Sequence, residues 1–190
     1  MKRLILKMSI SMDGFVGGPN GEMDWVVSSQ SDDGKKWVLE TLREAGTHVL
    51  GHRTYPGWAK YWPTSKDVLA APMNEIPKVV FSRTATPTPE GTAIDPSWER
   101  ARIVSGDLAE QIARLKREPG KDLLASGGAG FARSLVAAGL VDEYRLVVHP
   151  VVLGKGLALF ADLPAPLHLD VVETTTFSRG AIGRVLRPRR

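Results

Sequence analysis

The sequence predicts an α/β protein in which a mostly parallel sheet is flanked by helices and closed by a C-terminal antiparallel hairpin. Short apolar runs without polar alternation recur along the chain, as in strands that are covered on both faces. Amphipathic segments of helical period separate several of these runs, which favours parallel strands joined by right-handed crossovers. Two stretches near the C-terminus are joined by a short glycine-containing turn, which indicates a hairpin.

Six apolar runs are expected to form the first strands of the sheet. They are short and rich in Leu, Ile, Val and Ala, as buried strands are. The hairpin is expected to pair 167–177 with 181–186 through Ser178-Arg179-Gly180. The six runs lie at residues 4–6, 49–50, 79–81, 102–104, 123–125 and 146–148.

Three helices are expected between these strands. Residues 31–45 place Trp37, Val38, Leu42 and Ala45 on one side of a helix. A second helix begins after Asp107, which can cap it, and ends at Pro119-Gly120. A third covers 130–138 and stops at Gly139.

The chain is expected to form a single domain over residues 1–190. Its length suits one domain of ordinary size, and it contains no repeat and no linker. Residues 84–97 contain three prolines and are expected to form a surface loop within that domain. Four of the tryptophans are interpreted as packing residues: Trp37, Trp58, Trp62 and Trp98.

Composition excludes several classes of function. The chain has no cysteine, so it has no disulfide, thiol nucleophile or cysteine-based zinc site. The net charge of +4 is scattered except near the C-terminus, which argues against a nucleic-acid partner. The N-terminus reads as a strand and not as a signal peptide, and no stretch reaches transmembrane length. We therefore expect a cytoplasmic protein with no membrane partner and no bound metal.

Three expected strand ends carry groups that favour anions. In a doubly wound sheet, ligands bind at the carboxyl ends of the strands, where free N–H groups can hold phosphates. Each segment also has an ordinary reading, as a tight turn or as a surface arginine. Because two of them add arginine, a dinucleotide with an extra 2′-phosphate, NADPH, would use all three. The segments are Gly51-His52-Arg53-Thr54, Ser82-Arg83 and Gly127-Gly128-Ala129-Gly130-Phe131.

Longer motifs resemble the dihydrofolate reductase superfamily, and within it the C-terminal reductase domain of the RibD proteins of bacterial riboflavin biosynthesis. The resemblance covers nearly the whole chain. The most specific block contains a double glycine, a helix, G-L-V-D-E and a P-x-x-x-G-x-G-x-x-L-F tail. The motifs are SISMDGFVGG, MDW, LGHRTYPGW, FSRT and ASGGAGFARSLVAAGLVDEYRLVVHPVVLGKGLALF.

This resemblance implies a dihydrofolate-reductase-like fold and transfer of a hydride from NADPH to a small heterocyclic substrate, pyrimidine- or pterin-like. The nearest named activity is that of 5-amino-6-(5-phosphoribosylamino)uracil reductase. Residues 51–54 would hold the cofactor phosphates, and Ser82 and Arg83 would face the adenosine 2′-phosphate. Residues 127–131 would line the pyrophosphate and the nicotinamide side, and Met12, Val16 and Gly17 would border the nicotinamide ring.

The substrate side departs from the family pattern. Folate reductases carry a carboxylate in the first helix, and the corresponding place here falls near Gly34-Lys35. Asp33 is close, and it is a candidate either for substrate contact or for stabilising the helix N-terminus. The Asp-Pro loop of the riboflavin-pathway enzymes has no match in residues 61–77. The further substrate-side candidates, each with a packing alternative, are Asp24, Trp25 and His149.

Three hypotheses of function remain at this point. The first is an NADPH-dependent reductase that acts on a CH–NH, C=N or C=O bond, with no catalytic residue assigned. The second is a nucleotide-binding protein of the same fold that has lost catalysis, suggested by the missing carboxylate. The third is binding of nucleic acid by the arginine-rich C-terminus, which would weaken steeply with salt. A homodimer is also expected, because the hairpin leaves a sheet edge to cover.

Overall fold

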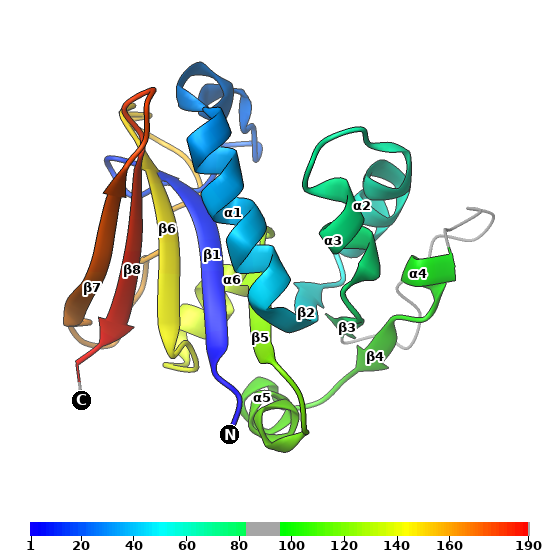
Figure 1. Ribbon diagram of the computed structural model, residues 1–190. Helices are drawn as coiled ribbons and strands as arrows, with labels where there is room; N and C mark the ends of the chain where they lie inside the picture. The colour runs from blue at the N-terminus through cyan, green and yellow to red at the C-terminus, as the bar shows by residue number, and fades with distance from the viewer. Residues whose placement is uncertain (83–95, 190) are drawn as a thin grey trace.

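The computed structural model describes residues 1–82 and 96–189. Eight strands in this part of the chain form one sheet in the order β4-β3-β2-β5-β1-β6-β8-β7 (Figure 1). The strands are β1 (Leu4–Ser11), β2 (Ala45–Gly51), β3 (Lys78–Phe81), β4 (Arg102–Val104), β5 (Asp122–Ser126), β6 (Glu143–His149), β7 (Leu169–Thr176) and β8 (Ile182–Pro188).

The sheet is parallel from β4 to β6 and becomes antiparallel at its C-terminal strands. β1 lies between β5 and β6 and pairs in parallel with both. β8 pairs antiparallel with β6 and with β7, so the hairpin extends the sheet at one edge. The predicted α/β class, the six apolar strands and the closing hairpin are therefore confirmed.

The three predicted helices are present with small shifts at their ends. Ser31 caps α1 by accepting a hydrogen bond from the Gly34 N–H, and Asp107 caps α5 by accepting one from the Glu110 N–H. α6 begins one residue earlier than predicted, directly after Gly128. These helices are α1 (Asp32–Glu44), α5 (Leu108–Arg117) and α6 (Ala129–Ala137).

Shorter helices that the sequence did not predict occupy the connections. The predicted loop 84–97 needs one correction, since its last two residues begin α4, while 84–95 lie outside the described residues. Proline at the first or second position suits the start of α2 and of the 3₁₀ turn that follows it. The short elements are the 3₁₀ turns η1 (Asp24–Ser29) and η2 (Trp62–Thr64) and the helices α2 (Tyr55–Tyr61), α3 (Ala70–Glu75) and α4 (Pro96–Glu99).

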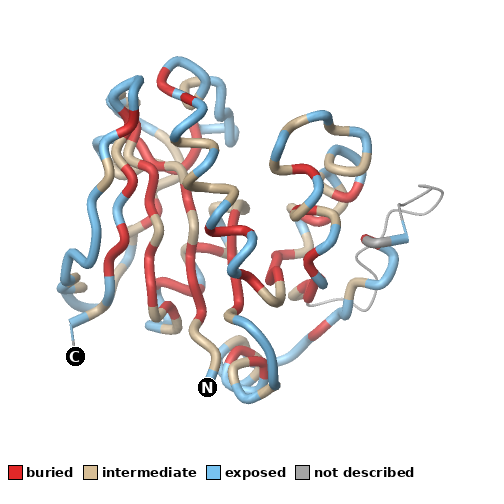
Figure 2. The backbone as a smooth tube through the Cα atoms, in the orientation of Figure 1, coloured by how far each residue is buried: buried red, intermediate tan, exposed pale blue. Residues whose placement is uncertain are grey.

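Helices cover both faces of the central strands. Leu4 and Leu6 of β1 belong to the larger core, to which α5 and α6 contribute, whereas Ile5 joins Leu42 of α1 on the opposite face. Because alternate residues of β1 face different helices, the first three residues of the strand are apolar without alternation. Buried residues accordingly concentrate in the central strands, while β7 is largely exposed (Figure 2).

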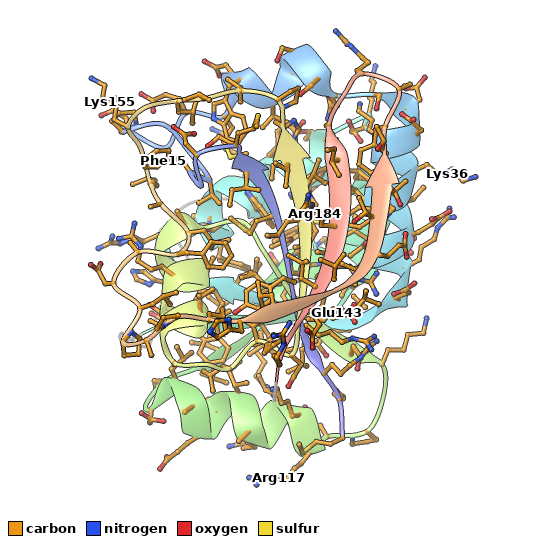
Figure 3. The ribbon with its side chains drawn as sticks, turned by 90° about the vertical axis from the view of Figure 1, so that its left-hand side faces the viewer. Phe15, Lys36, Arg117, Glu143, Lys155 and Arg184 are labelled. Carbon is orange, nitrogen blue, oxygen red and sulfur yellow. The ribbon has the colours of Figure 1, made fainter. Side chains whose placement is uncertain are left out.

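The two ends of the parallel strands differ in chemistry. At the amino end of β6, the Glu143 carboxylate is almost fully buried and pairs with Arg3, Arg145 and Arg187 at 2.7–2.9 Å. Figure 3 places Glu143 at the opposite end of the sheet from Phe15 and Lys155. The ion-pair cluster therefore stabilises one end, and the loops of the carboxyl end remain to form a site. No helix in the described part of the chain is long and apolar enough to cross a membrane.

Candidate functional site

A cavity of about 1050 Å³ opens at the carboxyl ends of the parallel strands. This is the position at which open α/β sheets bind ligands. Its size exceeds that of most small-molecule pockets and suits a dinucleotide together with a second ligand. The groups at its two ends differ: glycine turns with hydroxyl and basic side chains at one end, and a lysine among apolar side chains at the other.

Glycines shape the first end of the cavity. Phe131, at the start of α6, packs against the end of β2, where a Cβ on Gly51 would lie 2.9 Å from Phe131 Cβ. Gly128 has a φ of +74°, and a Cβ there would overlap the Thr54 hydroxyl. The two turns that follow β2 and β5 therefore approach each other closely. Free backbone N–H groups at the start of α6 face the same region.

A third turn borders this end of the cavity. Ser105 and Gly106 connect β4 to α5, and both line the cavity together with Leu108. Gly106 has a φ of +99°, a conformation that glycine adopts without strain. Sequence reasoning overlooked this turn because it contains neither a double glycine nor a basic residue.

Lys7 and Ser126 lie side by side at the other end of the cavity. They are registered partners on the parallel strands β1 and β5, so their side chains point to the same face of the sheet. Burial lowers the pKa of the Lys7 ammonium to about 8. Within residues 1–82 and 96–189, no group accepts a hydrogen bond from Lys7 or pairs with its charge.

Apolar side chains enclose this end. Trp58 and Trp62 stand edge to face, with ring centroids 6.1 Å apart, and the Trp62 indole N–H is buried without a partner among the described residues. None of the described residues that line the cavity is Asp or Glu. Lys7 and Ser126 therefore offer hydrogen-bond donors in an apolar setting that has no carboxylate. The apolar wall comprises Val38, Leu42, Trp58, Trp62, Leu69 and Met73.

A smaller chamber of about 70 Å³ adjoins the cavity and shares Lys7 with it. His149, at the end of β6, lines the chamber, and its Nδ1 lies 2.8 Å from the Ser29 hydroxyl. Burial, followed by the positive charge of Lys7, lowers the pKa of His149 to about 4, so the imidazole is neutral at physiological pH. Its Nε2 is buried without a partner in the described part of the chain.

The structure brings most of the predicted cofactor residues to one cavity. Met12 and Gly17 are not among the lining residues: Met12 is 68% exposed, and the Gly17 carbonyl accepts a hydrogen bond from Leu157 N–H at 2.9 Å. Arg83 lies outside the described residues. The predicted residues that line the cavity are Val16, Gly51, His52, Arg53, Thr54, Ser82, Gly127, Gly128, Ala129, Gly130 and Phe131.

Of the four predicted substrate residues, only His149 lines either of these two cavities. Trp25 packs edge-on against the His149 ring, with centroids 5.4 Å apart, and Asp24 is exposed beside it. Asp33 accepts hydrogen bonds from the backbone and hydroxyl of Ser178, at 2.7 and 2.9 Å. The contacts of Asp33 are thus those of a residue that ties α1 to the β7–β8 turn.

Comparison with known proteins places this architecture in a family. The family model of the RibD C-terminal domain matches residues 2–182. This chain belongs to the RibD C-terminal domain family. A relative from Bacillus subtilis (strain 168), YyaP, is 34% identical over 186 residues, which cover 95% of this chain and 92% of YyaP. A second protein of that organism, YwjB, is 25% identical over 180 residues, or 94% of each chain.

Solved structures share the fold of this RibD C-terminal domain. A putative riboflavin biosynthesis protein from Shewanella sp. PV-4 superimposes with a TM-score of 0.77 at 21% identity, covering 99% of both chains. Dihydrofolate reductase from Enterococcus faecalis, solved with NADP(H), gives a TM-score of 0.61 at 13% identity and covers 99% of this chain and 97% of the enzyme. The predicted family and the dihydrofolate-reductase-like fold are confirmed.

Sequence reasoning missed several residues that line the cavity of this RibD C-terminal domain. Lys7 carried a usable signal, because a lysine interrupts the apolar run with which the strand begins. Ser126 precedes the double glycine and offered no signal of its own. Trp58 and Trp62, interpreted as packing residues, do pack, but they also line the cavity. Only the fold of residues 55–76 over the sheet reveals that second role.

Proposed function

We propose that this chain is an NADPH-dependent reductase whose substrate is small and presents hydrogen-bond acceptors. One observation supports this proposal above the others: a single cavity joins the glycine turns after β2 and β5 to the unpaired ammonium of Lys7. Membership of the RibD C-terminal domain family supports oxidoreductase chemistry. Pyrimidine-like rings and simple carbonyl compounds both present the required acceptors.

The residues at the glycine end fit a dinucleotide. Gly128 has no side chain to fill the space beside Thr54, so its backbone remains accessible to a pyrophosphate. Ser105, His52 and Arg53 border the same region, and Arg53 is exposed with no hydrogen bond or ion pair to the described residues. Its guanidinium is thus available for a phosphate. We assign this free cation to the 2′-phosphate, which NADPH carries and NADH lacks, and the assignment predicts a preference for NADPH.

The lysine end fits the other half of the reaction. NADPH supplies the hydride, and a carbonyl substrate takes up one proton as well to become an alcohol. Lys7 carries a proton that it can release near neutral pH, because burial has lowered its pKa to about 8. The Ser126 hydroxyl, which lies beside Lys7, can orient the acceptor oxygen. A substrate with a protonated ring would need a carboxylate partner, and none of the described lining residues is Asp or Glu.

Cofactor binding is the first experiment. NADPH and NADH are titrated into the protein while the fluorescence of its five tryptophans is followed. We expect tighter binding of NADPH, a preference reduced about tenfold or more in Arg53→Ala because a charge-assisted phosphate contact is lost. Arg114→Ala, an exposed arginine outside the cavity, serves as the control and leaves both affinities unchanged.

Turnover is the second experiment. NADPH oxidation is followed with benzaldehyde, 5-amino-6-(5-phosphoribosylamino)uracil and dihydrofolate, for the wild type and for Lys7→Met. We expect oxidation with an acceptor-bearing compound other than dihydrofolate, and a loss of at least a hundredfold in Lys7→Met with NADPH affinity retained. Tight NADPH binding without any turnover would contradict the reductase proposal and favour the nucleotide-binding alternative. Absence of NADPH binding would contradict both.

A further inference from the structure

A row of three polar side chains crosses one face of the sheet beneath the lysine end of the cavity, where the substrate is proposed to bind. Lys7 of β1 and Ser126 of β5 are registered neighbours. His48 of β2 continues the row, with Nε2 2.8 Å from Ser126 Oγ. Lys7 and Ser126 line the cavity, whereas His48 is fully buried and does not. His48 therefore has no direct route to a ligand, although it contacts a residue that does.

The surroundings of His48 determine its protonation. Burial, followed by the positive charge of Lys78, lowers the pKa of His48 to about 3, so the imidazole is neutral at physiological pH. A neutral imidazole has one N–H donor and one bare acceptor nitrogen. Nδ1 is buried without a partner among the described residues. Because buried N–H groups without acceptors are rarer than buried acceptors without donors, the proton belongs on Nε2, where Ser126 can accept it.

The direction of this hydrogen bond controls the Ser126 hydroxyl. A serine hydroxyl has one hydrogen to donate and two lone pairs that accept. With Oγ accepting from His48, the hydroxyl hydrogen stays free, and no described residue accepts it. The cavity is the remaining direction. In the other tautomer the hydroxyl would donate to His48 and present only lone pairs to a ligand.

We propose that His48 is a positioning residue that keeps the Ser126 hydroxyl as a donor directed into the cavity, so that Ser126 and Lys7 bind one oxygen of the substrate together. The inference rests on the proposed function and adds a substrate class: a flat molecule with a carbonyl or carboxylate oxygen. The apolar wall that includes Trp58 and Met73 suits the flat part. Compounds that present only donors at this point are rejected, because two donors would face a third.

The tautomer provides a test that does not depend on turnover. The four histidines are labelled with ¹⁵N, and the signal of His48 is assigned by its disappearance in His48→Gln. We expect a neutral ring with hydrogen on Nε2 from about pH 5 to about pH 9. A hydrogen on Nδ1, or a ring that gains charge near pH 6, would overturn the proposal, because the hydroxyl would then point toward His48 or lose its fixed direction.

Binding of a probe tests the consequence. Benzoate presents acceptor oxygens on a flat ring, and benzylamine presents a donor on a ring of the same size. In the protein with NADPH present, we expect benzoate to bind more tightly than benzylamine. We expect benzoate to bind about tenfold more weakly in Ser126→Ala and in His48→Leu, with no further loss in the double variant. His48→Gln retains a donor and should bind benzoate nearly as the wild type does.

Controls separate this inference from packing effects and from the proposed function. Thr41→Val removes a buried hydroxyl that bonds to Trp37 and Arg145 away from the cavity, and it should leave benzoate binding unchanged. Additive losses in the double variant, or no benzoate binding to the wild type, would overturn the inference. Absence of hydride transfer with every compound would overturn the proposed function alone, because the tautomer and the benzoate results would stand.

Discussion

The ring of Trp58 lies against the backbone of Gly127, so closely that a Cβ at this glycine would overlap the ring. Gly127 also has a φ of +73°, which strains any other L-residue. Through this contact, Trp58, the part of the cavity wall that comes from α2, packs on the turn that follows β5. The glycine is therefore required for two reasons, its backbone conformation and the space that the indole occupies.

We expect Gly127→Ala to displace Trp58 and to lower the free energy of unfolding by about 2 kcal/mol, as overpacking and left-handed strain each do. NADPH affinity should fall as well, because the turn that faces the cavity shifts. Urea unfolding measures the loss of stability, and the tryptophan emission maximum reports the displacement of Trp58. In the matched variant Gly57→Ala no atom lies within 4 Å of the new Cβ, and the helix should gain roughly 0.5–1 kcal/mol. Equal stability of both variants would contradict the contact.

The charge of Lys7 predicts how activity depends on pH. Its pKa is lowered to about 8, so the ammonium donor is present below pH 8 and is lost above it. We expect kcat/KM to fall as the pH rises through 8, with no matching change in NADPH affinity. A pH–rate profile from about pH 6 to about pH 10 measures this, since kcat/KM reports the groups of the free enzyme. A profile that stays flat to pH 10 would exclude Lys7 as the proton donor.

Glu143 is expected to be the carboxylate on which stability depends most. Its side chain is 1% exposed and contacts three arginines. Glu143→Gln removes the buried negative charge that the three arginines share. Arg3 keeps Asp122 and Arg145 keeps Glu44, but Arg187 loses its ion pair. We therefore expect a loss of about 3 kcal/mol in the free energy of unfolding, measured by denaturant titration. The control is Asp170→Asn, which breaks an ion pair whose side chains are 64% and 55% exposed and should cost about 0.5 kcal/mol or less.

Lowering the pH should remove the contribution of Glu143 to the free energy of unfolding. Burial by itself would raise the pKa of this carboxyl group, but hydrogen bonds from Arg145 and Arg187 outweigh it, and the pKa lies below its usual 4.5. A carboxylate with a lowered pKa stabilises the fold above its unfolded value and ceases to do so as the pH falls through its folded value. The difference in stability between wild type and Glu143→Gln should therefore be largest above pH 4.5 and shrink below it. A constant difference down to about pH 2 would contradict this assignment.

A substitution of Asp33 distinguishes a structural role of this residue from a role in substrate binding. Hydrogen bonds from Ser31 and then from Ser178 lower the pKa of Asp33 to about 2. We expect Asp33→Ala to lower the melting temperature, because the β7–β8 turn loses its tie to α1, while KM and NADPH affinity stay the same. Thermal unfolding and steady-state kinetics distinguish these outcomes. A raised KM at unchanged melting temperature would restore Asp33 as a substrate contact. Asp32→Ala, which changes the other acidic residue of the same helical turn, is the matched control for both measurements.

Elements whose signals are local could be predicted. The apolar runs of β1 and β5, the caps at Ser31 and Asp107, and the glycine turn of the hairpin depend on neighbours within a few residues. The turns at 51–54 and 127–131 were predicted because glycines directly follow an apolar run in both, and basic residues accompany them in the first. α2 and α3 were missed because they are only seven and six residues long, too short to show a helical period, and each contains a proline.

What the sequence by itself determined was therefore the kind of each main segment, the family and the glycine end of the cavity. The tertiary structure alone decided the strand order and, through it, the substrate end. Lys7, His48 and Ser126 are far apart in the chain, and they form one row because β1 and β2 both pair with β5. Strand pairing depends on packing between distant segments, which no local pattern records. The same packing buries Lys7 beside the cavity and lowers its pKa to about 8.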